Sequence, residues 1–525
     1  MTPSASSADA IWGRSERFAT VARNLITRYL VIFTDASIGL LVLPFNVHHL
    51  GPSQWGLWML MTSLNTYFSV LDLGYGGSIT RFVAFYRAKR DLKSLNEILS
   101  TLFTLFAAVG VVAYLGFVVV SFHITSIFNI EPDQVHTGRM VLLITGMFVS
   151  LGFPFSVYGG LINGFQRYDI NNMVGIATSI VAAIVNVAML LAGCSLVQLV
   201  TATTAVRVTA FLLYRRNAYR VFPALSIRPV HFRWSRLKEV TGFSIYVSVM
   251  DWSSKLNYSI DALVIGAYLS PAAVALWTVP QRIAEFLQRL TNQLNGVLFP
   301  VIVDSHAAER PDHLRVIFVQ GTRLSLFLVV PLGAAIFMLA GPLIRSWVGP
   351  QFEASIRIVQ ILVTVIAIRV GGATATILLK GAGRHRLLAF ANAGSAIVNL
   401  ALSLWWVRRY GLIGQALGTL FPVSAVCIFV VWPAACRRVG ISIPEAFRIA
   451  VWPALWPIAV TAATILTVRR AVPPNLFGVA VASAAGALAY ALVFFTLAIP
   501  RAERDLYAEK IRELLRRYSG IAAAA

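Results

Sequence analysis

The sequence predicts an all-α polytopic membrane protein with about fourteen transmembrane helices. They form two six-helix lobes in direct, same-orientation repeat, followed by two C-terminal helices. Three observations predict this fold. Of the 525 residues, 58% are apolar and 13% are charged, and the mean hydropathy is +0.73. The apolar residues fall in runs of about 20, the length of a helix that crosses a bilayer. A segment near the start of the chain also recurs in its second half, which indicates a duplication.

The first half of the chain begins with residues 1–25, which we expect to form an amphipathic segment on the cytoplasmic surface. Residues 26–230 are the predicted N-lobe. Its six spans are expected at 26–47, 55–78, 98–121, 140–162, 173–192 and 196–214. A basic loop separates them from the second half.

Residues 231–440 are the predicted C-lobe, with spans at 240–268, 272–303, 316–340, 356–379, 387–407 and 412–431. Residues 441–500 hold two further spans, 449–468 and 476–499, which have no counterpart in the first half. Residues 501–525 are rich in basic side chains and predict an amphipathic helix on the inner leaflet. A solvated helix is the alternative for this last segment.

The duplication is carried by the motif LGPSQWGLW at 50–58, which returns as LSPAAVALW at 269–277. Leucine, proline and tryptophan recur at matching positions, and Gly56 is matched by the small Ala275. Later in each half, Ile-Val-Asn at 184–186 is repeated at 397–399. An even number of spans per repeat gives both halves the same orientation, and a substrate would then bind between the lobes.

The net charge of +22 would suggest a nucleic-acid partner in a soluble protein. Here most lysines and arginines lie in alternate loops, and those loops face the cytoplasm if the N-terminus does. The opposite loops carry five arginines: Arg345, Arg408, Arg409, Arg469 and Arg470. This asymmetry follows the positive-inside rule, so both termini are predicted to be cytoplasmic. We expect no nucleic-acid partner.

Motifs for metal, redox or nucleotide chemistry are absent from the sequence. Cys194, Cys427 and Cys436 lack CxxC or CxxH spacing. No GxxxxGK[ST] loop occurs. We therefore expect no cofactor, and transport coupled to a gradient of H⁺ or Na⁺. The longest outside loop, 122–138, contains no evident catalytic constellation, so an enzyme is not expected.

Two segments resemble the polysaccharide exporters of the multidrug/oligosaccharidyl-lipid/polysaccharide superfamily, the Wzx-type flippases. They are LGPSQWGLWMLMTSLNTYFSVLDLGYGGSITRFVAFYRAK at 50–89 and SIDALVIGAYLSPAAVALWTVPQRIAE at 259–285. The resemblance implies export of an undecaprenyl-pyrophosphate-linked oligosaccharide across a bacterial plasma membrane, next to membrane lipids and with glycan polymerases or glycosyltransferases as candidate partners. A lipid II flippase and a multidrug antiporter of the same superfamily are alternatives. A membrane polymerase or ligase of lipid-linked sugars is the alternative from another class.

Charged residues inside spans are costly and usually face a cavity or each other. Arg282, Glu285 and Arg289 are spaced so that they share one face of a predicted helix. Two guanidiniums in line suit a pyrophosphate, because each can bind phosphate oxygens bidentately. The structural alternative is that Glu285 neutralises both arginines.

The preceding span carries Asp251, Lys255 and Asp261. Asp251 and Lys255 are four residues apart, which favours an ion pair, although Lys255 is also a candidate for the phosphate site. Asp261 is interpreted mainly as a packing residue, with ion coupling as the alternative.

The first lobe contributes Arg28 and two aspartates. Arg28 is either a residue of the membrane interface or part of the phosphate site. Asp35 and Asp72 are candidates for ion coupling, because a buried carboxylate can load and release a proton. Arg207 and Arg369 also lie deep in predicted spans, and the sequence leaves open which way they face.

Overall fold

The structure is a computed structural model that describes residues 17–68, 71, 75–238, 240, 260–500 and 503–505. All regular structure within these residues is helical, without a β-strand. Ten segments of this described part are long and apolar enough to cross a membrane. The predicted all-α membrane fold is confirmed, whereas the number of fourteen crossings stays a prediction.

The chain divides into two compact units, Met1–Thr278 and Val279–Ala525. The division falls inside α11 (Pro271–Ala307), and the predicted lobe boundary at residue 230 stays a prediction. Unit 1 also contains α2 (Arg17–Phe68), α3 (Tyr75–Ala88), α4 (Leu92–Phe122), α5 (Ile124–Ile127), η2 (Pro132–Gln134), α6 (Val135–Gly164), α7 (Tyr168–Leu191), α8 (Leu196–Val221), η3 (Pro229–His231) and α10 (Asp261–Tyr268).

Unit 2 continues with α12 (Pro311–Trp347), η4 (Pro350–Phe352), α13 (Ser355–Gly371), α14 (Ala373–Gly381), α15 (His385–Ala425), η5 (Val426–Val431), α16 (Trp432–Val439), α17 (Ile443–Ala446), η6 (Phe447–Val451), α18 (Trp452–Leu455), α19 (Ile458–Ala471), α20 (Leu476–Val493) and η7 (Phe494–Ala498). The elements η5, η6 and η7 are π-helical turns within longer apolar segments.

Two of the longest helices change direction at a glycine. In α2, Gly51 has φ 73° and ψ 165°, and in α15, Gly411 has φ 57° and ψ −136°. Positive φ is accessible to glycine at little steric cost, so each glycine lets two helices meet in a tight turn. Both turns fall where the sequence predicts a short connection between spans.

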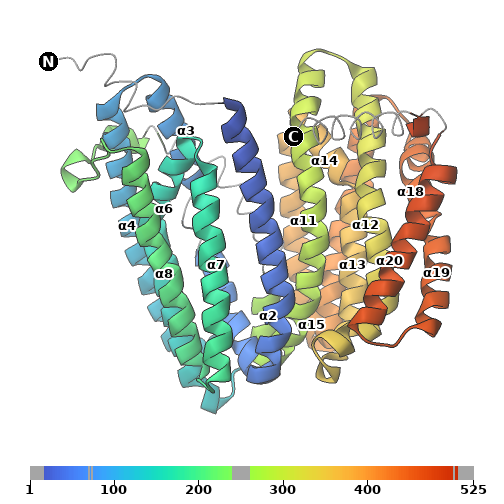
Figure 1. The fold of residues 1–525 in the computed structure, drawn as a ribbon, viewed down its shortest axis with the longest axis horizontal. Helices are drawn as coiled ribbons and strands as arrows, with labels where there is room; N and C mark the ends of the chain where they lie inside the picture. Colours follow the sequence, from blue (N-terminus) through green and yellow to red (C-terminus); the bar gives the residue numbers. More distant parts are fainter. Residues whose placement is uncertain are drawn as a thin grey trace, which may run out of the picture. The chain divides into compact units, whose positions relative to one another are not determined.

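In unit 1, α6 packs against α4, α8 and α3, and α2 packs against α7 (Figure 1). Apolar side chains of these helices form a core that includes Leu99, Phe106 and Val157. Each of these three side chains is fully buried, so the helices of unit 1 pack around a common apolar core. This core holds in place the polar side chains described below.

In unit 2, α12 packs against α13 and also against the C-terminal helices α19 and α20 (Figure 1). Arg323 of α12 is 5% exposed. Its guanidinium donates to the carboxylate of Glu503 and to the carbonyl oxygen of Ile449. Ile449 lies in the π-helical turn η6, a type of irregularity that is rare and often found at functional sites. One buried side chain thus joins α12 to the residue that begins the first of the last two predicted spans and to a residue that follows the second.

The two copies of the repeated motif touch within unit 1 at Gly56. A Cβ atom at Gly56 would lie 1.7 Å from the carbonyl oxygen of Pro271 and 3.0 Å from the backbone nitrogen of Ala275. We expect Gly56→Ala to lower the free energy of unfolding by about 2–3 kcal/mol, because overpacking forces the backbone apart. Thermal unfolding in detergent would measure this. Gly39→Ala, where a Cβ meets nothing within 4 Å, is the matched control. Equal effects at both sites would contradict the prediction.

Asp91 caps the start of α4, where its Oδ1 accepts a hydrogen bond from the Ser94 N–H at 3.0 Å. Hydrogen bonds from Ser94 hold the pKa of the Asp91 carboxyl below its ordinary value. A lowered folded pKa means that the cap stabilises the protein above the unfolded pKa, about 3.9, and loses this contribution as pH falls through the folded pKa.

Asp91→Ala is therefore expected to lower the free energy of unfolding by about 1 kcal/mol at pH 7. The difference from wild type should shrink in increasingly acidic buffer below about pH 4. Asp91→Asn, which caps without titrating, is the control and should stay constant over this range. Thermal unfolding across the pH series would measure the effect, and a difference that does not change with pH would contradict it.

Candidate functional site

The structure brings Arg282, Glu285 and Arg289 together on one side of α11, as their spacing predicts. Nη1 of Arg282 lies 3.3 Å from Oε2 of Glu285, and Nη2 of Arg289 lies 4.0 Å from the same oxygen. The second carboxylate oxygen accepts a hydrogen bond from Nε2 of Gln281 at 3.2 Å. One carboxylate thus serves two guanidiniums, which leaves an excess of one positive charge.

The side chains of Arg282, Glu285 and Arg289 are partly exposed, which leaves them accessible to a ligand. The side chains of Arg282 and Arg289 are 54% and 51% exposed, and that of Glu285 is 39% exposed. Ion pairs at this exposure contribute little to stability, about 0–1 kcal/mol. Each guanidinium has five N–H donors, most of which remain available. The arrangement can therefore accept an anionic group of a ligand without breaking a buried ion pair.

Arg28 and Asp35 lie in unit 1, on α2. Both are exposed, and Arg28 forms no ion pair with any residue of the described ranges. Asp35 Oδ1 accepts a hydrogen bond from Ser179 Oγ on α7 at 3.3 Å. Asp35 also interacts electrostatically with Arg207 of α8. Arg207, whose orientation the sequence leaves open, lies on α8, where it is exposed.

Asp261 is 7% exposed and lies in the first turn of α10. A carboxylate is favoured there by the partial positive charge of a helix N-terminus. It also interacts electrostatically with Tyr67 of α2. The other predicted site residues on these segments, Asp72, Asp251 and Lys255, lie outside the described residues.

Arg369 is the second arginine whose orientation the sequence leaves open. It lies near the end of α13 and interacts electrostatically with Cys427. Cys194, Cys427 and Cys436 are free thiols. Within the described ranges, no group of three or more His, Cys, Asp or Glu side chains is placed to hold a metal ion.

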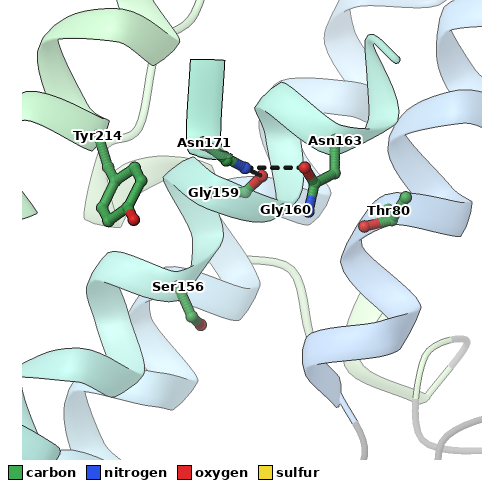
Figure 2. Close-up of a pocket in the computed structure, with 7 residues that line it drawn as sticks. All are labelled: Thr80, Ser156, Gly159, Gly160, Asn163, Asn171 and Tyr214. Atoms are coloured by element: carbon green, nitrogen blue, oxygen red, sulfur yellow. Dashed lines mark hydrogen bonds between the residues drawn. The ribbon is translucent and has the colours of Figure 1, made fainter. Parts of the chain in front are cut away.

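A pocket of about 300 Å³ opens on unit 1 between α3, α6, α7 and α8 (Figure 2). Its lining residues are uncharged: Thr80, Ser156, Gly159, Gly160, Asn163, Asn171 and Tyr214. Nδ2 of Asn171 donates to Oδ1 of Asn163 at 2.8 Å and to the carbonyl oxygen of Gly159 at 2.9 Å. These bonds fix two amide groups at the wall of the pocket.

Arg207 and the pocket residue Tyr214 lie along the same helix. On α8, Tyr214 follows Arg207 by seven residues, which places both on one face about 10 Å apart. Phe211 lies between them, and its ring stacks on Phe148 at 5.3 Å and on Phe155 at 5.2 Å between centroids. Unit 1 thus presents a strip with a charged arginine, stacked aromatic rings and a neutral polar pocket. The pocket could not be predicted from the sequence, because its residues come from four helices and share no motif.

The chain is similar to known proteins over most of its length. The family model described as polysaccharide biosynthesis protein matches residues 50–357. The probable flippase AglR of Haloferax volcanii is 23% identical over 423 residues, which cover 79% of this chain and 83% of the relative.

Two solved structures show the fold. The lipid II flippase MurJ, in an inward closed conformation, has a TM-score of 0.70 at 14% identity and covers 91% of this chain and 99% of its own. An inward-facing multidrug resistance transporter of the MATE family, in the MOP superfamily, has a TM-score of 0.64 at 14% identity and covers 80% and 98%. The chain therefore shares the fold of these two transporters. Since the family model matches more than half of the chain, the protein belongs to the polysaccharide biosynthesis protein family.

Proposed function

We propose that this protein is a flippase that moves an undecaprenyl-pyrophosphate-linked oligosaccharide from the inner to the outer leaflet of a bacterial plasma membrane. The observation that supports this most is the pair Arg282 and Arg289, half-exposed on one face of a membrane-length helix and sharing a single carboxylate. Two guanidiniums can bind the oxygens of a pyrophosphate bidentately. The name of the probable flippase among the relatives supports the same class of transport.

The physical obstacle to flipping is the head group, because sugars and phosphates do not enter hydrocarbon, whereas the polyprenyl tail stays in it. In this proposal Arg282, Arg289, Arg28 and Lys255 hold the pyrophosphate while the protein alternates between inward-open and outward-open states. An inside-negative potential favours outward movement of an anion by about 2.3 kcal/mol per charge per 100 mV. A gradient of H⁺ or Na⁺ supplies further driving force, with Asp35 and Asp72 as the first candidates for coupling.

The proposal includes the setting of the protein. Both termini face the cytoplasm, as the distribution of basic loops favours. Glycan polymerases or glycosyltransferases of exopolysaccharide, O-antigen or capsule assembly act on the transported lipid before or after it crosses, and the chain itself is not an enzyme.

The test is transport by the purified full chain in proteoliposomes. A fluorescent undecaprenyl-pyrophosphate-linked oligosaccharide is placed in both leaflets, and a membrane-impermeant reagent reports how much of it reaches the outside. Vesicles with the protein should expose the inner pool, and protein-free vesicles should not. Equal exposure in both would overturn the proposal.

The shared fold with the lipid II flippase favours one second candidate, transport of lipid II. Lipid II is included as a parallel substrate in the same vesicles. Faster flipping of lipid II than of the oligosaccharide-linked lipid would select that function. A multidrug antiporter is less favoured, because a cationic drug would be repelled by the excess positive charge on α11.

A further inference from the structure

The pocket on unit 1 has unused hydrogen-bonding groups that point to a ligand. The amide nitrogen of Asn163 and the hydroxyl of Tyr214 form no hydrogen bond with any residue that the structure describes. Oδ1 of Asn171 is buried and also lacks a partner among the described residues. In Figure 2, Asn163 and Asn171 lie between Tyr214 on one side and Thr80 on the other. Donors, acceptors and an aromatic ring therefore surround one space.

The position of the pocket indicates that it faces water instead of hydrocarbon. It continues the strip that contains Arg207 and Asp35, and charged groups within spans face a cavity or a protein interior, because contact with lipid tails is costly. Ser179 of α7, which binds Asp35, is eight residues after Asn171 on the same helix. The pocket, the aromatic rings and Arg207 thus follow one side of α8, and the charge of Arg207 favours water over lipid tails on that side.

From this chemistry we infer that the pocket binds an uncharged sugar of the transported oligosaccharide, apart from the arginines that hold the phosphates. Sugar hydroxyls are both donors and acceptors, and amide and hydroxyl side chains can pair with both roles. The flat ring of Tyr214 offers an apolar face next to a polar tip, which matches the alternation of C–H and O–H groups on a sugar ring. A volume of about 300 Å³ is at the lower end for small-ligand pockets, which suits a short part of a glycan.

The uncharged lining of the pocket favours neutral sugars over acidic ones. None of the seven lining residues carries a charge that would pair with a carboxylate. An acidic sugar would lose hydration there without gaining a partner, and this disfavours its binding. The site therefore selects neutral sugars over uronic acids.

This inference rests on the proposed flipping activity. A variant whose pocket is filled tests sugar binding separately from flipping. Gly159→Leu is the chosen variant, because a Cβ at position 159 meets only Nδ2 of Asn171, at 3.8 Å. The backbone therefore accommodates the side chain, whose end fills the pocket. Gly394→Leu, in an exposed part of α15 where a Cβ meets nothing within 4 Å, is the matched control.

The transport assay uses undecaprenyl pyrophosphate with a neutral hexose oligosaccharide and undecaprenyl pyrophosphate without sugar. Gly159→Leu should slow flipping of the first lipid about 5- to 150-fold, since loss of the hydrogen bonds to one sugar is worth about 1–3 kcal/mol. Flipping of the sugar-free lipid should not change, and the control should act as wild type on both. Equal loss on both lipids, loss on neither, or equal loss in the control would overturn the inference.

A binding assay on the detergent-purified chain keeps the pocket testable if wild-type protein flips neither lipid, a result that would contradict the proposed function itself. Calorimetry uses a free neutral hexose oligosaccharide and one of equal length that contains glucuronic acid. The neutral glycan should bind at least about tenfold more tightly, and Tyr214→Ala should weaken its binding, with a smaller effect of Tyr214→Phe. Equal affinity for both glycans, or neutral binding unchanged in Tyr214→Ala, would overturn the inference.

Discussion

Replacing Arg282 and Arg289 together with alanine is expected to slow flipping of the oligosaccharide-linked lipid at least about 100-fold. Hydrogen bonds to charged groups are worth about 1.5–3 kcal/mol each, and the variant loses such bonds from both guanidiniums to the pyrophosphate. Because the side chains are half-exposed, the fold should lose little stability. The measurement is the initial rate in proteoliposomes at matched protein content.

Glu285→Gln distinguishes this role from the structural alternative. If Glu285 mainly neutralises the arginines, its loss should impair the protein as much as the loss of both. If the arginines bind pyrophosphate, Glu285→Gln removes a competing carboxylate and leaves transport at least as fast as in wild type. Wild-type transport by a stable Arg282→Ala, Arg289→Ala variant would contradict the phosphate assignment.

Replacing Arg323 with alanine is expected to lower the free energy of unfolding by about 3–5 kcal/mol, because it removes a buried guanidinium and leaves the carboxylate of Glu503, whose side chain is 19% exposed, without its partner. The loss acts on two segments at once, since Arg323 binds both Glu503 and the carbonyl oxygen of Ile449. The expected result is an unfolding transition at lower temperature in detergent, with the helices α19 and α20 losing protection from hydrogen exchange first.

Arg315→Ala is the matched control on the same helix. Its ion pair with Glu445 is 2.6 Å long, but both side chains are 43% exposed, so we expect an effect of at most about 1 kcal/mol. A double-mutant cycle of Arg323 and Glu503 would isolate the coupling between them. Equal stability losses in Arg323→Ala and Arg315→Ala would contradict the importance of the buried pair.

Much of the fold could be predicted because its causes are local. Apolar runs long enough to cross a bilayer identify the spans, and the turns at Gly51 and Gly411 follow from short connections that contain glycine. The network around Arg323 could not be predicted in this way. Its partners are 126 and 180 residues away in the chain, and only packing of α12 with the C-terminal helices brings them together.

The candidate site also contains residues that the sequence predicts and residues that only the packing of the helices brings together. Arg282, Glu285 and Arg289 lie on one helix, so their spacing alone predicts that they share a face. The hydrogen bond from Ser179 to Asp35 depends on how α2 and α7 assemble, so the sequence alone does not predict it. The amide of Asn171 and the ring of Tyr214 are ordinary polar residues until the fold places them around a common pocket.

The contact at Gly56 has a consequence for how this protein tolerates sequence change. A side chain at position 56 would collide with the backbone of Pro271, and backbone atoms are present whatever residue occupies that position. No second-site substitution in the other copy of the motif can therefore make room. Most overpacked positions can be rescued by a smaller neighbour, but a smaller side chain at position 271 leaves this backbone contact in place, so we expect position 56 to accept only glycine.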